Sequence, residues 1–240
     1  MPIEPITTRA LLVCRDIQTS EMLCHCAQQM GIEIEICPNT PSATRKLCHN
    51  KFEAIIVDLV IGPAALDFIT KLHGMNSHKK ALVFAVSDTE ERTKAAFQAG
   101  ATFSLEKHAL PMTILRTLRA AYPMMVAERR RYFRYPLDTA VFIKNGASPE
   151  FRARSVNLSE AGIAIISNEP LNSGDRIQMR LCLPDTADFL IIAADVCWTK
   201  PEGQAGIQFQ HMLPAVKERL QNWLAARFDE CTQPLPAKLP

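Results

Sequence analysis

The sequence lacks several features that would place it in common classes of protein. It has no apolar run long enough to span a bilayer, and its first residues show no charged segment followed by an apolar one. We therefore expect neither membrane insertion nor a signal peptide, and a cytoplasmic location is the default expectation. A Gly-rich P-loop and a nucleophile elbow are also missing, so no hydrolase site is predicted.

A large excess of one charge is missing as well. The 27 lysines and arginines are nearly balanced by 25 aspartates and glutamates, which leaves a formal net charge of +2. This charge is too small to imply non-specific binding of nucleic acid by the whole chain. The basic character is instead local, at residues 129–134. A length of 240 residues with 48% hydrophobic and 22% charged residues suits two globular domains.

The eight cysteines include no Cys-x-x-Cys pair. Cys24-His25-Cys26 together with Cys48-His49 is the one cluster worth weighing as a zinc site. Neighbouring positions on a helix point to different faces, which argues against a shared metal. Reduced cysteines acting as small hydrophobic side chains are the favoured interpretation, and no metal site is predicted there.

Residues 1–124 alternate short apolar runs with helical patterns. The predicted strands are Ala10–Cys14, Ile32–Cys37, Ala54–Leu59, Ala81–Val86 and Thr102–Glu106. The predicted helices are Gln18–Met30, Pro41–Asn50, Ala64–His73, one opened by Ser87-x-x-Glu90 as a capping box and running to Gly100, and one from Pro111 that Pro123 weakens or ends. Five such units predict an α/β fold with a doubly wound, parallel, five-stranded sheet.

This half resembles the receiver domains of two-component systems. Asp58, in AIIVDLVIG, ends the third predicted strand, where receiver domains carry the aspartate that accepts a phosphoryl group. Ser87 and Lys107 end the fourth and fifth strands, and Asp16 follows the first. The resemblance implies that Asp16, Asp58, Ser87 and Lys107 form a phosphoacceptor and switch site. It implies Mg²⁺ only if this domain is phosphorylated.

One departure from the receiver pattern bears on that chemistry. Two adjacent acidic residues normally follow the first strand and hold Mg²⁺, whereas this chain has Cys14-Arg15-Asp16. The cation of Arg15 is expected to take the place of the ion or to pair with Asp58. Phosphoryl transfer to a carboxylate needs the metal to offset charge on the incoming oxygens. A pseudo-receiver that serves as an interaction module is therefore favoured over a phosphorylated switch.

From Thr139 onward the hydrophobic period changes to two, which predicts antiparallel strands. One predicted face consists of Leu190, Ile192, Ala194, Val196 and Trp198. The apolar stripe of Pro214–Phe228 predicts a helix that covers the resulting barrel. The predicted organisation is an α/β domain at 1–124, an arginine-rich connector at 125–138, a barrel with its C-terminal helix at 139–230, and a disordered tail at 231–240.

The second half also carries the motif Arg130-x-x-x-Arg134, followed by Asn157-x-Ser159-x-x-Gly162. This pair of motifs resembles the two-part signature of PilZ domains, which are small six-stranded β-barrels that bind the bacterial second messenger cyclic di-GMP. The resemblance implies that the arginines contact phosphate and guanine, and that the polar residues of the second motif contact guanine and nearby backbone. The implied ligand-binding residues are Arg129, Arg130, Arg134, Asn157, Ser159 and Gly162.

The sequence thus favours a non-enzymatic effector that binds cyclic di-GMP, changes its interdomain arrangement and signals to a protein partner. No GGDEF- or EAL-like run suggests a cyclase or phosphodiesterase. The partner would be a histidine kinase or a component of motility, exopolysaccharide or biofilm control. The alternatives are a response regulator controlled mainly by phosphorylation of Asp58, and an adaptor that has lost ligand binding. The oligomeric state, and whether one ligand or a stacked pair binds, stay open.

Overall fold

The computed structural model describes residues 7–75, 78–186 and 188–231. By its internal contacts the chain divides into two compact units, with the division between Arg130 and Arg131 and the second unit ending at Glu230. The predicted disordered tail lies outside the described residues except for Cys231, which ends the last helix. Within the described ranges, none of the helices combines the length and apolar character that crossing a bilayer requires.

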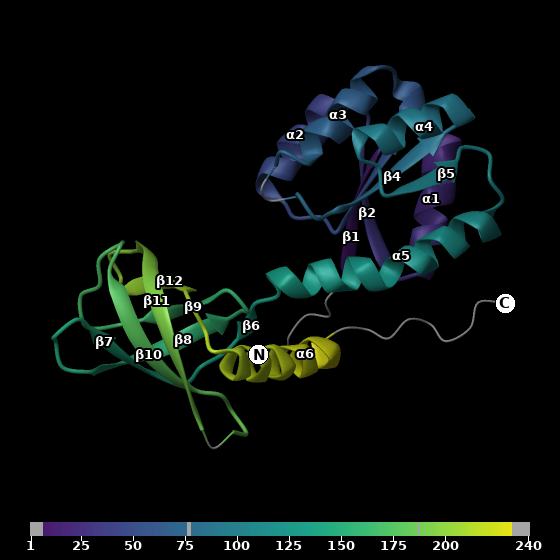
Figure 1. Cartoon of the computed structure of the whole chain (residues 1–240). Coiled ribbons are helices and arrows are strands. Elements are labelled where there is room, and N and C mark those ends of the chain that lie inside the picture. Colours follow the sequence, from purple (N-terminus) through teal and green to yellow (C-terminus); the bar gives the residue numbers. More distant parts are fainter. Residues whose placement is uncertain (1–6, 76–77, 187, 232–240) are drawn as a thin grey trace. The chain divides into compact units, whose positions relative to one another are not determined.

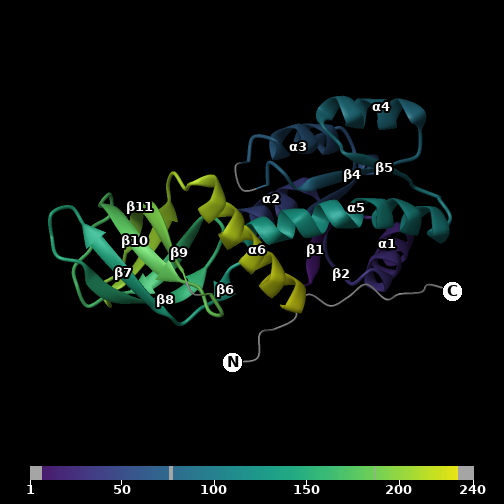
Figure 2. The same ribbon diagram turned by 60° about the horizontal axis from the view of Figure 1, so that its bottom comes forward.

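The first unit is built on a five-stranded parallel sheet (Figures 1 and 2). Its strands are β1 (Thr8–Val13), β2 (Ile32–Cys37), β3 (Ala54–Asp58), β4 (Leu82–Ser87) and β5 (Phe103–Glu106). They lie in the order β2-β1-β3-β4-β5, which is the order of flavodoxin-like and receiver folds. The predicted doubly wound sheet is therefore confirmed, and its switch point lies between β1 and β3.

Helices cover both faces of this sheet. They are α1 (Ile17–Gln29), α2 (Thr40–His49), α3 (Ala64–Leu72), α4 (Glu90–Ala99) and α5 (Pro111–Tyr132), with a short 3-10 helix η1 (Leu59–Ile61) after β3. Buried side chains of α1 and α5 pack on one face, and those of α2, α3 and α4 pack on the other. Every residue of β3 is buried, as the continuous apolar run at Ala54–Leu59 predicts for a strand covered on both sides.

Two local predictions in this unit are wrong. Ser87 does not cap α4: the cap is Thr89, whose hydroxyl accepts a hydrogen bond from Arg92 N at 3.3 Å. Ser87 is still paired with Glu106 in the sheet, so the helix begins two residues later than predicted. Of the two alternatives given for Pro123, that it ends α5 is wrong, because the helix continues to Tyr132 with Ala121 and Met125 on either side buried in the core.

The second unit is a closed antiparallel barrel. Its strands are β6 (Tyr135–Pro136), β7 (Ala140–Asn145), β8 (Phe151–Leu158), β9 (Gly162–Ile166), β10 (Arg176–Cys182), β11 (Phe189–Thr199) and β12 (Gln204–Phe209). Six of them close a ring in the order β8-β7-β10-β11-β12-β9, through the pairing of β9 with β8, and β6 adds a short edge. Leu220 and Leu224 of α6 (Pro214–Cys231) join the barrel core, so the predicted barrel and covering helix are confirmed.

One prediction about the barrel is wrong. Leu190, Ile192, Ala194 and Val196 are buried as predicted, but Trp198 is 42% exposed. The register of β11 against β12 shifts between Val196 and Trp198, and such a bulge moves the next side chain to the other face. Trp198 therefore points to the outside of the barrel.

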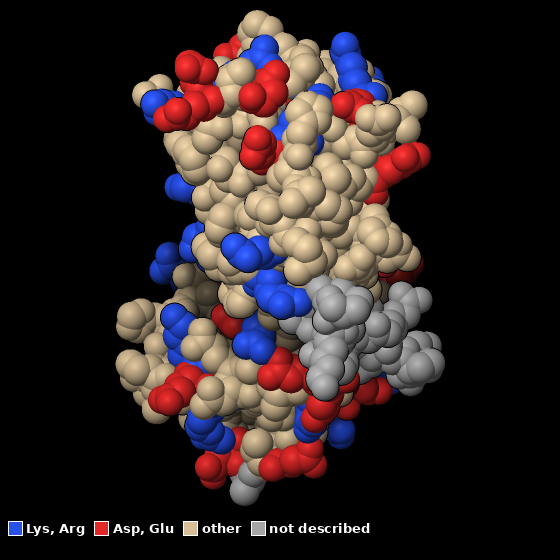
Figure 3. All heavy atoms as spheres, turned by 90° about the vertical axis from the view of Figure 1, so that its right-hand side faces the viewer, with Lys and Arg blue, Asp and Glu red and all other residues tan. Residues whose placement is uncertain are grey.

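On the face shown in Figure 3, cationic and anionic side chains lie among one another, as the small net charge suggests.

Candidate functional site

A pocket of about 220 Å³ lies on the second unit and brings parts of both arginine and asparagine–serine–glycine motifs together. Arg134, Ser159 and Gly162 all line it. The remaining lining comes from Ala161, Ile163, Ala164, Cys197, Trp198, Gly206, Ile207 and Gln208. The pocket thus combines one guanidinium, short polar groups, exposed backbone and one large aromatic face.

Aromatic packing fixes the segment that carries Arg134. Phe133 packs edge-on against Phe228 of α6, with ring centroids 5.2 Å apart, and Tyr135 packs edge-on against Trp223 at 5.3 Å. These two residues flank Arg134, whose own side chain is exposed. Both rings therefore anchor this segment to α6. The anchoring holds the Arg134 backbone while its guanidinium stays accessible.

The second motif forms the tight connection between β8 and β9. The Ser159 hydroxyl donates to Gly162 O at 3.0 Å, and Ser159 N donates to the same oxygen at 2.9 Å. A side chain on residue 162 would bring its Cβ well under 3.0 Å from Ile207 O, so β12 packs directly on this backbone. Gly162 is therefore required for the contact between β9 and β12, in addition to the ligand-binding role that the resemblance implies for it.

Asn157 occupies the end of β8, at a register shift between β8 and β9. Its side-chain oxygen Oδ1 is buried, and within the part of the chain that the structure describes no donor lies within hydrogen-bonding distance of it. Buried acceptors without a partner are uncommon in folded proteins and call for an explanation. A base with N–H donors, such as guanine, would supply the missing partner.

Trp198 is the largest of the pocket residues that sequence reasoning did not assign to binding. Its ring packs over Gly206, where a Cβ would collide with the indole, and the ammonium of Lys200 lies 5.6 Å from the ring centroid. The sequence feature that could have indicated this contact is the glycine, Gly206, that pairs with Trp198 near the end of the barrel. The bulge that turns Trp198 outward is not visible in the alternation of residues 190–198.

The other two predicted arginines belong to the last turns of α5, in the first unit. Arg130 is half-buried there. Arg129 forms an ion pair with Glu53, with 3.4 Å between Arg129 Nη1 and Glu53 Oε1. Of the six predicted ligand-binding residues, the pocket therefore contains Arg134, Ser159 and Gly162, with Asn157 on the adjoining strand. Their role in binding stays a prediction.

The receiver-like site is organised around the buried Asp58 at the end of β3. Lys107 Nζ lies 3.0 Å from Asp58 Oδ2 and 3.3 Å from Asp16 Oδ2. Burial alone would lower the pKa of Lys107, but its hydrogen bonds to Asp58 and Asp16 outweigh burial and raise it. The structure thus brings three of the four predicted residues together around a stable ammonium group.

Three neighbours of Asp58 differ from the sequence expectation. The side chain that reaches Asp58 from the end of β1 is Cys14, whose Sγ donates to Asp58 Oδ2 at 3.4 Å. Arg15 does not pair with Asp58, because its Nε donates to Pro38 O at 3.0 Å. Ser87 Oγ lies 2.5 Å from Thr93 Oγ1, so its hydroxyl is engaged with α4.

The residues around Asp58 do not fit Mg²⁺. This ion requires an octahedral set of oxygen ligands, whereas the groups that contact the Asp58 carboxylate are the Lys107 ammonium, the Val60 N–H and the Cys14 thiol. The Asp16 carboxylate is used to cap α1, accepting from Gln18 N at 3.0 Å, and to pair with Lys107. Across the residues that the structure describes, no three His, Cys, Asp or Glu side chains are grouped to hold a metal ion. The cation beside Asp58 is therefore Lys107.

This arrangement predicts that Asp58 is not phosphorylated. When the chain is incubated with acetyl phosphate and Mg²⁺, we expect no label on Asp58, since the groups that contact this carboxylate are hydrogen-bond donors and not the oxygen ligands of the ion that offsets the incoming charge. Intact-mass spectrometry measures the label. A Cys14→Asp/Arg15→Asp variant, which restores two acidic side chains, is the positive control. Labelling of the unmodified chain that Asp58→Asn abolishes would contradict the prediction.

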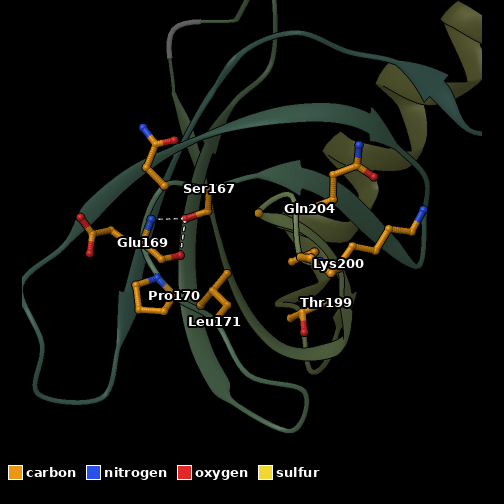
Figure 4. A pocket seen from close by; sticks show the side chains of 11 residues that line it. Ser167, Glu169, Pro170, Leu171, Thr199, Lys200 and Gln204 are labelled. Carbon is orange, nitrogen blue, oxygen red and sulfur yellow. Dashed lines mark hydrogen bonds between the residues drawn. The ribbon is translucent and has the colours of Figure 1, made fainter.

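A second cavity of about 270 Å³ lies on the same barrel (Figure 4). Ser167, Glu169, Pro170 and Leu171 line one side, and Thr199, Lys200 and Gln204 line the other. The Ser167 hydroxyl is used locally, donating to Glu169 O at 2.8 Å and accepting from Glu169 N at 3.0 Å. The charged ends of Glu169 and Lys200 point in opposite directions in Figure 4, so they do not converge on a common ligand.

The fold and the pocket define a two-unit protein, with a receiver-like α/β unit followed by a small barrel that carries a pocket on its surface. Residues 128–226 match the family model described as PilZ domain, so this part of the chain is a PilZ domain. None of the curated proteins compared with the chain matches it.

Solved structures match each unit separately. The chemotaxis response regulator CheY4 of Vibrio cholerae is 25% identical over 48% of this chain and 98% of its own, with a TM-score of 0.44. The receiver domain of a Pseudomonas aeruginosa sensor histidine kinase, with magnesium in its active-site cleft, is 15% identical over 48% and 97%, with a TM-score of 0.44. The PilZ domain of CeSA from a cellulose-synthesizing bacterium is 16% identical over 40% and 97%, with a TM-score of 0.33. The strand orders, and not these scores, carry the assignment of the folds.

Proposed function

We propose that this chain is a non-enzymatic receptor for cyclic di-GMP. The observation that carries the proposal is the pocket on the barrel that is lined by Arg134, Ser159 and Gly162 together. The match of residues 128–226 to the PilZ family supports the same ligand. Binding is proposed to change the arrangement of the two units, and a protein partner in motility, exopolysaccharide or biofilm control is proposed to recognise the changed surface. We place this activity in the cytoplasm.

The chemistry of the pocket suits the ligand. Cyclic di-GMP carries two phosphate charges and two flat guanines. A guanidinium such as that of Arg134 can form bidentate hydrogen bonds with a phosphate and can stack on a purine. Asn157 Oδ1, which has no hydrogen-bond partner among the described residues and belongs to the strand beside the pocket, is proposed to accept a guanine N–H. Each charge-assisted hydrogen bond contributes about 1.5–3 kcal/mol, so a few of them reach the roughly 8 kcal/mol that micromolar binding requires.

Isothermal titration of the full chain with cyclic di-GMP tests the proposal. We expect a Kd in the micromolar range or tighter. A stoichiometry near one ligand per chain indicates a single nucleotide, and a value near two indicates a stacked pair. Absence of heat and of any thermal shift at saturating ligand would contradict the receptor function. The receiver-like unit and its protein partners would then carry the function.

Trp198 is predicted to stack on a guanine base. Stacking of a base on an aromatic ring is worth about 1–3 kcal/mol, so we expect Trp198→Ala to weaken binding by roughly 5- to 150-fold. Phe189→Ala is a matched control, because Phe189 lies on the same strand with nearly the same exposure, 41% against 42%. Equal affinities of both variants and the unmodified chain would rule out a stacking role for Trp198.

A further inference from the structure

Glu53 is a buried carboxylate in the first unit that faces the start of the arginine motif. It immediately precedes β3 and is 1% exposed. Its Oε2 accepts a hydrogen bond from Arg9 N at 2.7 Å, and its Oε1 lies 3.4 Å from Arg129 Nη1. The carboxylate is therefore held between one backbone N–H of β1 and one guanidinium of α5.

Arg129 is one of two partners that favour the ionised form of Glu53. Burial raises the pKa of Glu53, and the N–H of Arg9 and the guanidinium of Arg129 offset this effect in part. The guanidinium of Arg9 is itself paired with Glu35 and lies over the Phe52 ring. Removing one member of a buried ion pair is costly, because the remaining charge is left without compensation. Glu53 therefore holds Arg129 in place.

Arg129 also stands where the ligand motif begins. It directly precedes Arg130, and the PilZ family match starts one residue before it. A guanidinium can form bidentate hydrogen bonds with either of two anions, a phosphate of an incoming nucleotide or the Glu53 carboxylate. A side chain that turns to the phosphate leaves the buried Glu53 carboxylate without its guanidinium partner. The two anions thus compete for one cation.

We propose that Glu53 is a built-in competitor for Arg129, through which the first unit lowers the affinity of the arginine motif for cyclic di-GMP. This regulation rests on the receptor function proposed above. Because coupling between two equilibria is reciprocal, ligand that recruits Arg129 also weakens the Glu53–Arg129 pair. The first unit then senses occupancy of the barrel through the end of α5, without any phosphorylation of Asp58.

A double-mutant cycle on the full chain tests this competition by isothermal titration with cyclic di-GMP. Glu53→Gln keeps an acceptor for Arg9 N but removes the charge, and it is expected to tighten binding on the order of tenfold. In an Arg129→Ala background the same replacement is expected to change the affinity by less than about twofold, since no cation remains to be released. Glu35→Gln removes a carboxylate that pairs with Arg9 and Lys46, and is expected to leave the affinity unchanged.

A measurement on the unmodified chain makes the test independent of how the variants fold. Hydrogen exchange of the backbone around Glu53 and Arg9 is expected to speed up when cyclic di-GMP is saturating, while exchange in the barrel slows. Binding by the unmodified chain, with equal affinity in Glu53→Gln and unchanged exchange around Glu53, would overturn the competitor and leave the receptor standing. Absence of binding by the unmodified chain would overturn both.

Discussion

Replacing Arg130 and Arg134 together by alanine is expected to abolish measurable binding of cyclic di-GMP. Two charge-assisted hydrogen bonds at about 1.5–3 kcal/mol each amount to a loss of roughly 10²- to 10⁴-fold in affinity. A Kd of about 1 μM would move to roughly 0.1–10 mM. Isothermal titration of the variant beside the unmodified chain measures the loss, and thermal unfolding checks that the exposed Arg134 and half-buried Arg130 are not needed for folding.

The control for this pair must remove two positive charges from exposed positions outside the pocket. Lys144 and Arg176 serve, because both are exposed on barrel strands and neither lines the pocket. Lys144→Ala/Arg176→Ala is expected to lower the affinity by no more than a few fold, through loss of long-range attraction that added salt screens. Similar losses in both double variants would mean that general positive charge, and not the arginine motif, attracts the ligand.

The regular parts of the fold were predictable from local patterns. The continuous apolar run at Ala54–Leu59 is typical of a strand that is covered on both faces. The alternation of apolar and polar residues in Arg176–Leu183 is typical of a barrel strand with one face turned to the core. Each pattern fits only one type of strand once the neighbouring strands and helices are in place. Strand order and barrel closure follow from these elements and their short connections.

The failures lie where tertiary contacts override a local preference. Pro123 costs α5 one hydrogen bond, but burial of Ala121 and Met125 keeps the helix intact beyond it. Trp198 leaves the inner face because of a bulge, and alternation alone carries no sign of an extra residue. The side chain beside Asp58 is Cys14 and not Arg15, because the direction of each side chain at the end of β1 decides which one turns inward.

The candidate site was predictable as a set of residue types, but not as a set of contacts. Arg134, Ser159 and Gly162 come together at the pocket as the paired motifs suggest. The partner of Arg129 was not foreseeable, since Glu53 is 76 positions away in sequence and carries no motif. Gly162 has a further role that only the structure reveals, because its neighbour Ile207 comes from a strand that is distant in sequence.

Gly162→Ala is expected to destabilise the barrel strongly. The added Cβ would lie well under 3.0 Å from Ile207 O and 3.3 Å from Gln208 Cα, and both are backbone atoms of β12 that cannot rotate away. Overpacking of this kind costs about 3 kcal/mol, and we expect the melting temperature of the second unit to fall by about 10 °C or more. Differential scanning calorimetry of the full chain, with circular dichroism of the barrel, measures the shift.

The same variant separates the two explanations for this glycine. Gly74→Ala is the control, because a Cβ there would meet only Lys71 O, at 3.4 Å, and its stability is expected to change by less than about 1 kcal/mol. If Gly162→Ala unfolds at a lower temperature, the glycine is needed so that β9 and β12 can pair, and any loss of ligand follows from the damaged pocket. An unchanged melting temperature with weakened binding of cyclic di-GMP would contradict this and would mean that the ligand itself approaches the Gly162 backbone.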